Sequence, residues 1–161
     1  MNFEIYDKKR LDGTVIRASS SKLGAVELLE RLKRAGRSGV VQAFDADSVI
    51  NRTHLVGAYL NAVAAFKEHR NIAKNMSMEM LLFAAMTTQI EDAIKLVGIK
   101  STSNFILFAN NQRAFEKVNE VLTGEKNFLP TKKHIKDAAV LFDIHSDYDK
   151  NILSKMALSR L

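Results

Sequence analysis

The segment NFILFAN, residues 104–110, decides the class of fold. Its apolar core has no polar alternation and is only a few residues long, which is typical of a strand buried on both faces. A second apolar run, GVVQAF at 39–44, predicts another buried strand, and we expect these two strands to lie at the centre of a sheet. Weaker strand patterns occur in GTVIRAS at 13–19 and in FEIY at 3–6. The sheet is therefore small, and its strands are far apart in the chain.

Helical periodicity fills the intervals between these strands. The expected helices cover residues 19–36, 45–70, 78–86, 89–97, 111–124, 131–143 and 146–161. The helix at 131–143 has an alternative, in which it runs into a short strand at VLFDI, 140–144. Widely spaced strands with helices between them predict an α/β (α+β) fold, with a central sheet flanked by helices in one small domain over residues 1–161.

Side chains that can cap a helix mark where these helices begin and end. Thr88 with Glu91, and Ser146 with Asp149, have the spacing of a capping box. The other expected boundaries are Ser21, Asp47 or Ser48, and the helix-ending glycines Gly36, Gly98 and Gly124.

Composition narrows the class of protein. The 161 residues include no cysteine, which excludes disulfides and thiolate metal sites. No apolar run reaches the length of a membrane span and the first residues lack a secretory h-region, so we expect a cytoplasmic protein without membrane contact. The net charge of +6 is concentrated in residues 1–40 and 121–161. A net positive charge of this size permits phosphate contacts with nucleic acid but does not require them.

No catalytic or cofactor signature is present in the sequence. It lacks a glycine-rich phosphate loop, paired histidines at metal spacing and a nucleophile elbow, so we expect no cofactor and no metal. The segment DIHSDYD, 143–149, alternates acidic residues with His145. Its later aspartates fit the first turn of a helix better than a cation site. A small enzyme without a recognisable motif, using Asp143 and His145, stays open as an alternative.

Two segments are candidates for anion contacts. Arg70 and Lys74 are four residues apart with Asn71 and Asn75 alongside, a spacing that places them on one helix face. The segment TTQI, 87–90, opens a helix, where free backbone N–H groups attract anions. On physical grounds alone, ordinary solvated or capping roles explain both segments better than anion contacts do.

The terminal helix raises the question of a partner. Its apolar residues sweep roughly 240° of the helix circumference, more than the stripe of about 100° that packing on one domain requires. We expect Ile152 and Met156 to face outward, and Leu153 and Ala157 to face the protein's own core. A homodimer in which this helix pairs with a second copy is an alternative.

Three stretches resemble one known family. They are 40–66, 70–99 and 151–160, with Phe44-Asp45, Glu79 and a T-x-Q-I segment among their shared features. They are similar to the smallest adaptor subunit of the KEOPS complex, the family of the PRPK-binding protein TPRKB, in its archaeal form.

The resemblance implies a binding function rather than catalysis. It implies contact with the amino-terminal lobe of a kinase-like ATPase of the Bud or PRPK type, and support of tRNA threonylcarbamoyladenosine modification next to the anticodon. It also implies recruitment of tRNA through the 3′ CCA end. The expected kinase interface comprises Ile152, Leu153, Met156 and Leu158. The expected RNA contacts comprise Arg70, Asn71, Ile72, Lys74, Thr87, Thr88 and Gln89.

Overall fold

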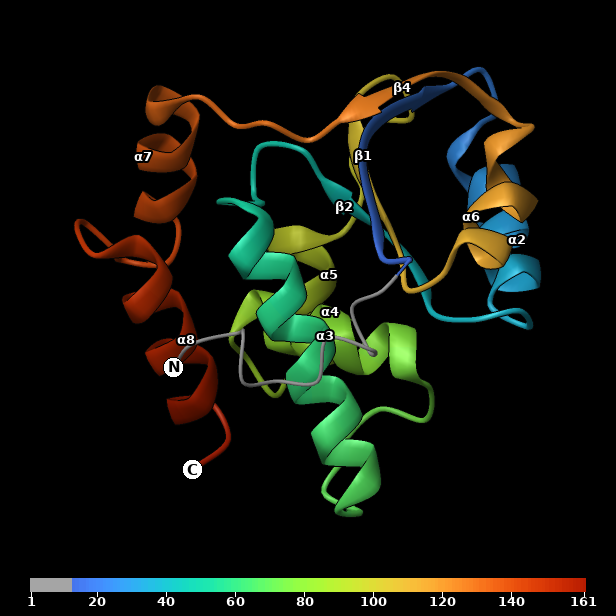
Figure 1. Cartoon of the computed structure of the whole chain (residues 1–161). Helices are drawn as coiled ribbons and strands as arrows, with labels where there is room; N and C mark the ends of the chain where they lie inside the picture. The colour runs from blue at the N-terminus through green and yellow to red at the C-terminus, as the bar shows by residue number, and fades with distance from the viewer. Residues whose placement is uncertain (1–12) are drawn as a thin grey trace. The chain divides into compact units, whose positions relative to one another are not determined.

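Four strands form one antiparallel sheet in the order β2-β3-β1-β4 (Figure 1). The strands are β1 (Val15–Ser21), β2 (Val41–Asp45), β3 (Phe105–Ala109) and β4 (Leu122–Asn127). The computed structural model describes residues 13–161, so the strand predicted at 3–6 lies outside the described residues. The predicted α/β fold class is confirmed by this sheet and by the helices α2 to α8.

β3 is an inner strand of the sheet and pairs with a neighbour on each side. All its residues are buried, and Ala109 is in register with Val15 of β1 on one side and with Val41 of β2 on the other. The prediction for NFILFAN is therefore confirmed. The expectation that GVVQAF is also central is wrong, because β2 pairs with β3 alone among the described strands and forms an edge.

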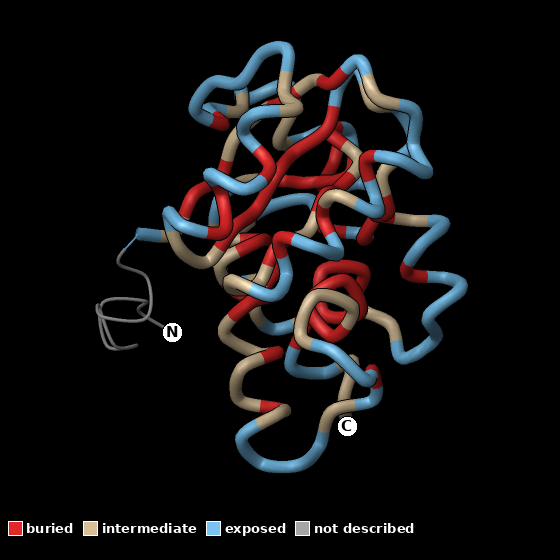
Figure 2. Tube along the Cα trace, turned by 90° about the vertical axis from the view of Figure 1, so that its right-hand side faces the viewer, coloured by how far each residue is buried: buried red, intermediate tan, exposed pale blue. Residues whose placement is uncertain are grey.

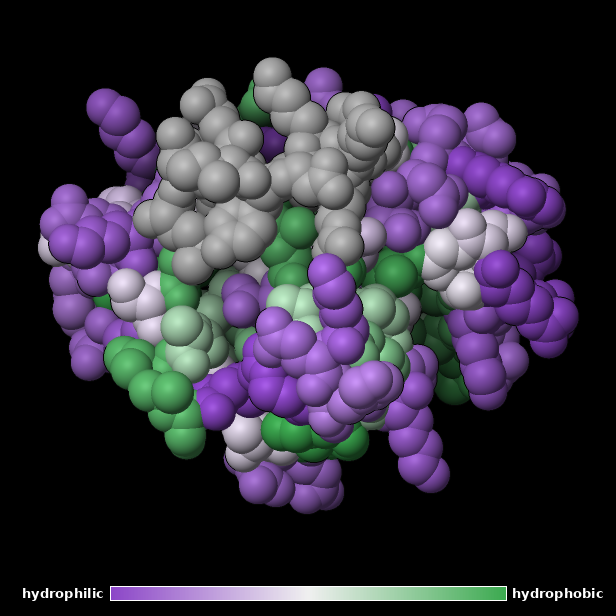
Figure 3. Space-filling view, turned by 60° about the horizontal axis from the view of Figure 1, so that its bottom comes forward, coloured by the Kyte–Doolittle hydropathy of each residue, from purple (hydrophilic) through white to green (hydrophobic). Residues whose placement is uncertain are grey.

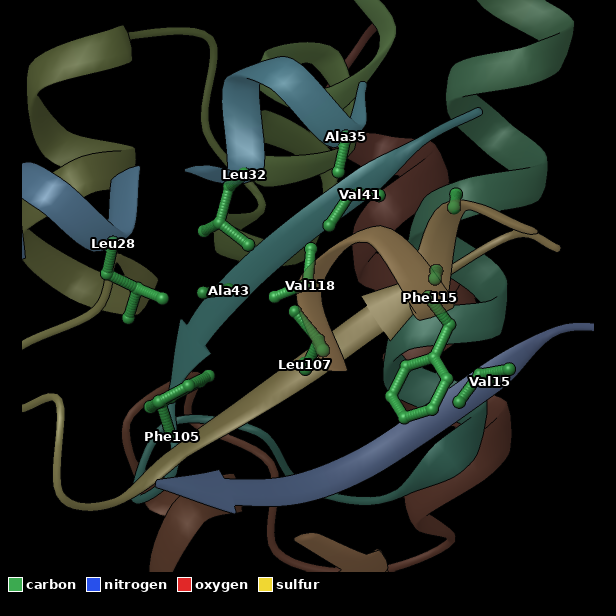
Figure 4. Close-up of a cluster of buried hydrophobic side chains, with 12 residues drawn as sticks. Val15, Leu28, Leu32, Ala35, Val41, Ala43, Phe105, Leu107, Phe115 and Val118 are labelled. Atoms are coloured by element: carbon green, nitrogen blue, oxygen red, sulfur yellow. The ribbon is translucent and has the colours of Figure 1, made fainter. Parts of the chain in front are cut away.

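The helices α2 (Ala25–Ala35) and α6 (Gln112–Asn119) cover one face of the sheet. Alternate strand residues such as Phe105 and Leu107 point to this face, as the two-residue period of a strand requires (Figure 4). The cluster is completed by Val15, Leu28, Leu32, Ala35, Val41, Ala43, Ala109, Ala114, Phe115 and Val118. The opposite face of the sheet carries the equally buried Ile16, Phe44, Ile106 and Phe108.

The chain divides into two compact units. The sheet unit comprises residues 13–46 and Ile99–Phe128, and the helical unit comprises Asp47–Gly98 and Leu129–Leu161. The helical unit contains α3 (Arg52–Lys67), α4 (Met76–Ala85), α5 (Ile90–Val97), α7 (Lys132–Val140) and α8 (Tyr148–Leu158). A single domain over residues 1–161 stays a prediction.

α4 is the buried helix of the helical unit. Every residue from Glu79 to Ala85 is buried, as expected for a helix that is apolar all round (Figure 2 draws buried residues in red). No helix in residues 13–161 has both the length and the apolar character needed to cross a membrane.

One strand was not expected from the sequence. The helix predicted over 111–124 ends at Asn119, and Gly124 lies inside β4 instead of closing that helix. β4 is exposed at every position after Leu122, so it has no apolar alternation that could reveal it. The short strand considered at 140–144 is absent, since α7 reaches Val140 and turns follow it.

Several helix starts lie a few residues from their expected positions. Ser21 ends β1, and the cap of α2 is Gly24. α3 is capped by Asn51, whose side-chain oxygen accepts from the His54 backbone N–H at 3.0 Å, so neither Asp47 nor Ser48 serves as its cap. At α8 the cap position belongs to Asp147 (φ 43°) instead of Ser146. The observed caps lie one to four residues after the expected ones, because a sequence pattern specifies a helix better than it specifies the helix ends.

Candidate functional site

The terminal helix α8 packs on α3 through a face about 100° around the helix from the one expected. Ile152 and Met156 have 0% exposed surface, so the prediction that they face outward is wrong. Ala157, assigned to the core, is exposed, and Leu153 is half-buried. The wide apolar arc of α8 was compatible with either orientation, which is why the sequence did not distinguish them.

Gly57 explains why this face of α8 lies inside. A Cβ atom at Gly57 would lie 2.8 Å from Cδ2 of Leu153 and 3.3 Å from the sulfur of Met156. α3 therefore presents bare backbone to α8, and the two helices approach closely there. Asn61, one turn further along α3, has its amide nitrogen 3.9 Å from the same sulfur.

Polar contacts hold α8 along its length. Near its start, the Asn51 side chain donates to the Asp149 carboxylate at 2.8 Å while its oxygen caps α3. In its last turn, Lys155 donates to the backbone carbonyl of Phe142 at 2.6 Å. Just after it, Arg160 lies 2.8 Å from the carboxylate of Glu79 on α4. These contacts fix which side of α8 faces outward.

Exposed apolar residues lie at the end of α8 and in the segment after it. Leu158 is 63% exposed and Leu161 is 99% exposed. Figure 3 shows hydrophobic side chains at the surface among hydrophilic ones on one face of the molecule. Of the four expected interface residues, Leu158 and in part Leu153 are accessible, while Ile152 and Met156 support the helix from inside.

The loop before α4 holds the first group of predicted RNA contacts. Arg70 is exposed and pairs with Glu68 at 2.6 Å. The Asn71 side chain donates to the Ala73 carbonyl at 2.9 Å, which closes a tight turn. Ile72 and Lys74 are exposed on either side of the buried Ala73. The loop therefore presents one apolar and one basic side chain from a hydrogen-bonded backbone.

The second group of predicted RNA contacts follows α4. Met86 (φ 55°) ends that helix in the left-handed conformation. The Thr87 hydroxyl accepts from the Gln89 backbone N–H at 3.2 Å, and Gln89 occupies the cap position of α5 without a side-chain cap bond. The capping box expected from Thr88 is therefore wrong. Thr88 and Gln89 are exposed.

The two groups lie at opposite ends of α4. Residues 70–74 precede its cap Asn75, and residues 87–89 follow its last residues. A helix of this length spans about 15 Å. The structure therefore places the two groups of predicted contacts apart, one at each end of α4.

Asp143 and His145 form a surface pair. The His145 ring nitrogen lies 2.8 Å from the Asp143 carboxylate, and both side chains are mostly exposed. The hydrogen bond from His145, with the nearby charge of Lys155, holds the pKa of Asp143 below its usual value. Within residues 13–161, no three potential metal ligands gather in one place.

Two residues beside the candidate site have structural roles that the sequence did not reveal. Glu79 and Arg160 form a buried ion pair that joins α4 to the segment after α8. The signal was a single acidic residue within the apolar run 78–86, which calls for a cationic partner once that run is buried. Only tertiary structure identifies Arg160 as that partner.

A family model described as kinase binding protein CGI-121 matches residues 24–159. The chain belongs to the CGI-121 family. A regulatory protein Cgi121 from Methanocaldococcus jannaschii is 34% identical over 84 residues, which cover 52% of this chain and 54% of the relative. A KEOPS complex subunit Cgi121 from Pyrococcus abyssi is 39% identical over 54 residues, 34% of this chain and 32% of the relative. The matched part of the chain thus spans about half the length of the first relative and about a third of the second.

Proposed function

We propose that this chain is a non-catalytic, cytoplasmic subunit of a KEOPS-type complex, which binds the kinase-like ATPase subunit and recruits tRNA. The family match over residues 24–159 carries the proposal. Both relatives support it through their descriptions, one as a regulatory protein and one as a KEOPS subunit. The complex would modify the adenosine next to the anticodon to threonylcarbamoyladenosine.

The outward side of α8 is the proposed kinase contact. Leu158 is an exposed apolar residue in the last turn of a helix that Ile152 and Met156 hold from beneath, and the exposed Leu161 follows that helix. A rigid helix with apolar side chains facing outward meets the requirements for docking into a groove. Truncating an apolar anchor at the centre of an interface typically costs about 2 kcal/mol or more of binding free energy.

A pair of glutamate substitutions tests the kinase contact. Leu158→Glu should abolish retention of the kinase-like subunit in a pull-down while the melting temperature of the lone protein is unchanged. Val140→Glu, at a similarly exposed apolar position on α7, is the matched control and should retain the kinase. Retention by Leu158→Glu would exclude this end of α8 as the kinase surface, and equal loss in both variants would point to α7 as well.

The loop 70–74 and the segment 87–89 are the proposed contacts for the tRNA end. Lys74 and Arg70 supply positive charge for phosphates, and the exposed Ile72 supplies an apolar contact for an unstacked base. Thr87, Thr88, Gln89 and Asn71 supply polar groups for base edges and ribose. Two contact points about 15 Å apart suit an extended single-stranded end better than one enclosed base.

A comparison of intact and trimmed tRNA tests this contact. Intact tRNA should bind much more tightly than tRNA lacking its CCA end. Lys74→Gln should weaken binding and reduce the salt slope by about 1, because one phosphate contact is lost. Lys136→Gln, which removes an exposed lysine from α7, should leave both unchanged. Equal affinity for intact and trimmed tRNA would rule out end recognition.

A further inference from the structure

One buried carboxylate holds the loop before α4 in place. Glu79 has 0% exposed surface, and its Oε2 accepts from the backbone N–H groups of Ile72 at 3.1 Å and Ala73 at 2.8 Å. Two consecutive peptide groups thus share one acceptor. This arrangement fixes the backbone on which the exposed Ile72 side chain is carried.

A buried carboxylate needs a compensating charge, and Arg160 provides it. The Arg160 side chain is 8% exposed, and its Nη1 lies 2.8 Å from Oε1 of Glu79. The guanidinium carbon also lies 4.0 Å from the ring centroid of Phe83, which is one turn after Glu79 on α4. The arginine therefore lies along α4, although it comes from the segment after α8.

The two members of this pair depend on each other. Arg160 Nε and Nη2 are buried without a hydrogen-bond partner among residues 13–161, so Glu79 and Phe83 provide its principal interactions. Removing either charge leaves the other buried and uncompensated. A change at Arg160 is thus transmitted to Glu79, and from Glu79 to the peptide groups of the loop.

We propose that Glu79 and Arg160 are a positioning pair for loop 70–74. Arg160, from the segment after α8, fixes the carboxylate that shapes the loop from which Ile72 and Lys74 project. The proposal rests on the proposed RNA contact, whose loop it concerns. It adds that the terminal segment, beside the proposed kinase surface, also sets the geometry of that loop.

Hydrogen exchange in the lone protein tests the pair without RNA. Arg160→Met should speed exchange of the Ile72 and Ala73 amides about tenfold relative to reference amides of Ala62 and Leu82. Arg160→Lys, which keeps the charge, should restore part of the protection. The double variant Glu79→Gln/Arg160→Met should lose less protection at these amides than the two single variants lose in sum. A neutral acceptor at position 79 needs no compensating charge.

Lys155→Met is the matched control, because it also replaces a basic residue that ties α8 to the protein. It should leave the two loop amides unchanged. Equal acceleration of loop and reference amides in Arg160→Met would indicate general destabilisation and overturn the proposal. Unchanged loop amides would overturn it as well.

The affinity for CCA-ended tRNA provides the second readout. Arg160→Met should reduce it about fivefold, and Lys155→Met should not change it. Loop amides that loosen without a loss of tRNA affinity would overturn the positioning role. If the wild-type protein does not distinguish intact from trimmed tRNA, the proposed tRNA contact fails, and the exchange rates alone decide whether the pair shapes the loop.

Discussion

His54 is a buried histidine whose proton position is fixed by its two neighbours. Its Nδ1 accepts from the backbone N–H of Ile50 at 3.0 Å, so Nε2 carries the proton and donates to the carbonyl of Ala84 at 2.7 Å. The ring also meets Phe142 edge to face, with centroids 5.0 Å apart. A second proton, carried on Nδ1, would face the Ile50 N–H and would have no acceptor. The fold therefore favours the neutral ring.

Acid should therefore destabilise the protein through His54. Burial lowers the pKa of His54 from 6.5 to about 4, so between these values the unfolded chain binds a proton that the folded chain does not. Stability should fall as pH decreases through this window, by about 3 kcal/mol at pH 4. Denaturant unfolding at several pH values measures the slope.

The control for this effect is His54→Gln. Glutamine offers an acceptor and a donor but does not titrate, so this variant should be less stable at pH 7 and less sensitive to pH between 6.5 and 4. An unchanged slope in the variant would assign the acid sensitivity to other groups. The carboxylates with lowered pKa, Asp137 and Asp143, lose their stabilising contribution at lower pH, so they contribute little in this window.

Between helices, the α3–α8 contact depends on the absence of a side chain at Gly57. Gly57→Leu should push α8 away and lower the free energy of unfolding by about 1–3 kcal/mol, because Leu153 and Met156 already fill the space. Gly57→Ala should change stability little, since the end of the Leu153 side chain can move and alanine favours the helix. Thermal denaturation of both variants measures the difference.

A large loss in Gly57→Ala would show that the α3–α8 contact is more rigid than its flexible side chains suggest. No loss in Gly57→Leu would contradict the buried position of Ile152 and Met156.

The elements differ in how well the sequence predicted them, for identifiable reasons. β3 is apolar at every position because both its faces are buried, so its pattern was sufficient. β4 pairs with β1 but buries almost nothing, so only its backbone hydrogen bonds define it. The arc of α8 predicted a helix with two apolar sides, but Gly57 on α3, nearly a hundred residues earlier, determines which side is inside.

The residues of the proposed site also differ in how far the local sequence predicts them. The exposed positions of Lys74, Thr88 and Gln89 follow from their polarity and their places beside helix ends. The Glu79–Arg160 pair could not be predicted, because its partners are 81 residues apart and neither has a local pattern that names the other. Charge pairs between residues this far apart in sequence are identified only by the tertiary structure.

At the scale of the whole molecule, neither unit is continuous in sequence. The chain passes from one unit to the other at residues 46–47, 98–99 and 128–129. Because no single cut separates the units, we expect them to unfold together as one domain, with equal calorimetric and van't Hoff enthalpies in a thermal scan. Two resolved transitions would contradict the single domain over residues 1–161.

The central place of β3 has a consequence for synthesis on the ribosome. β1 and β2 are made early, yet among the described strands β2 pairs only with β3, and β1 only with β3 and β4. Until residue 109 has emerged, the nascent chain carries two strand segments, β1 and β2, that have no partner among the described strands. Such segments pair readily with other chains, so this protein should depend on chaperone shielding during translation more than its small size suggests.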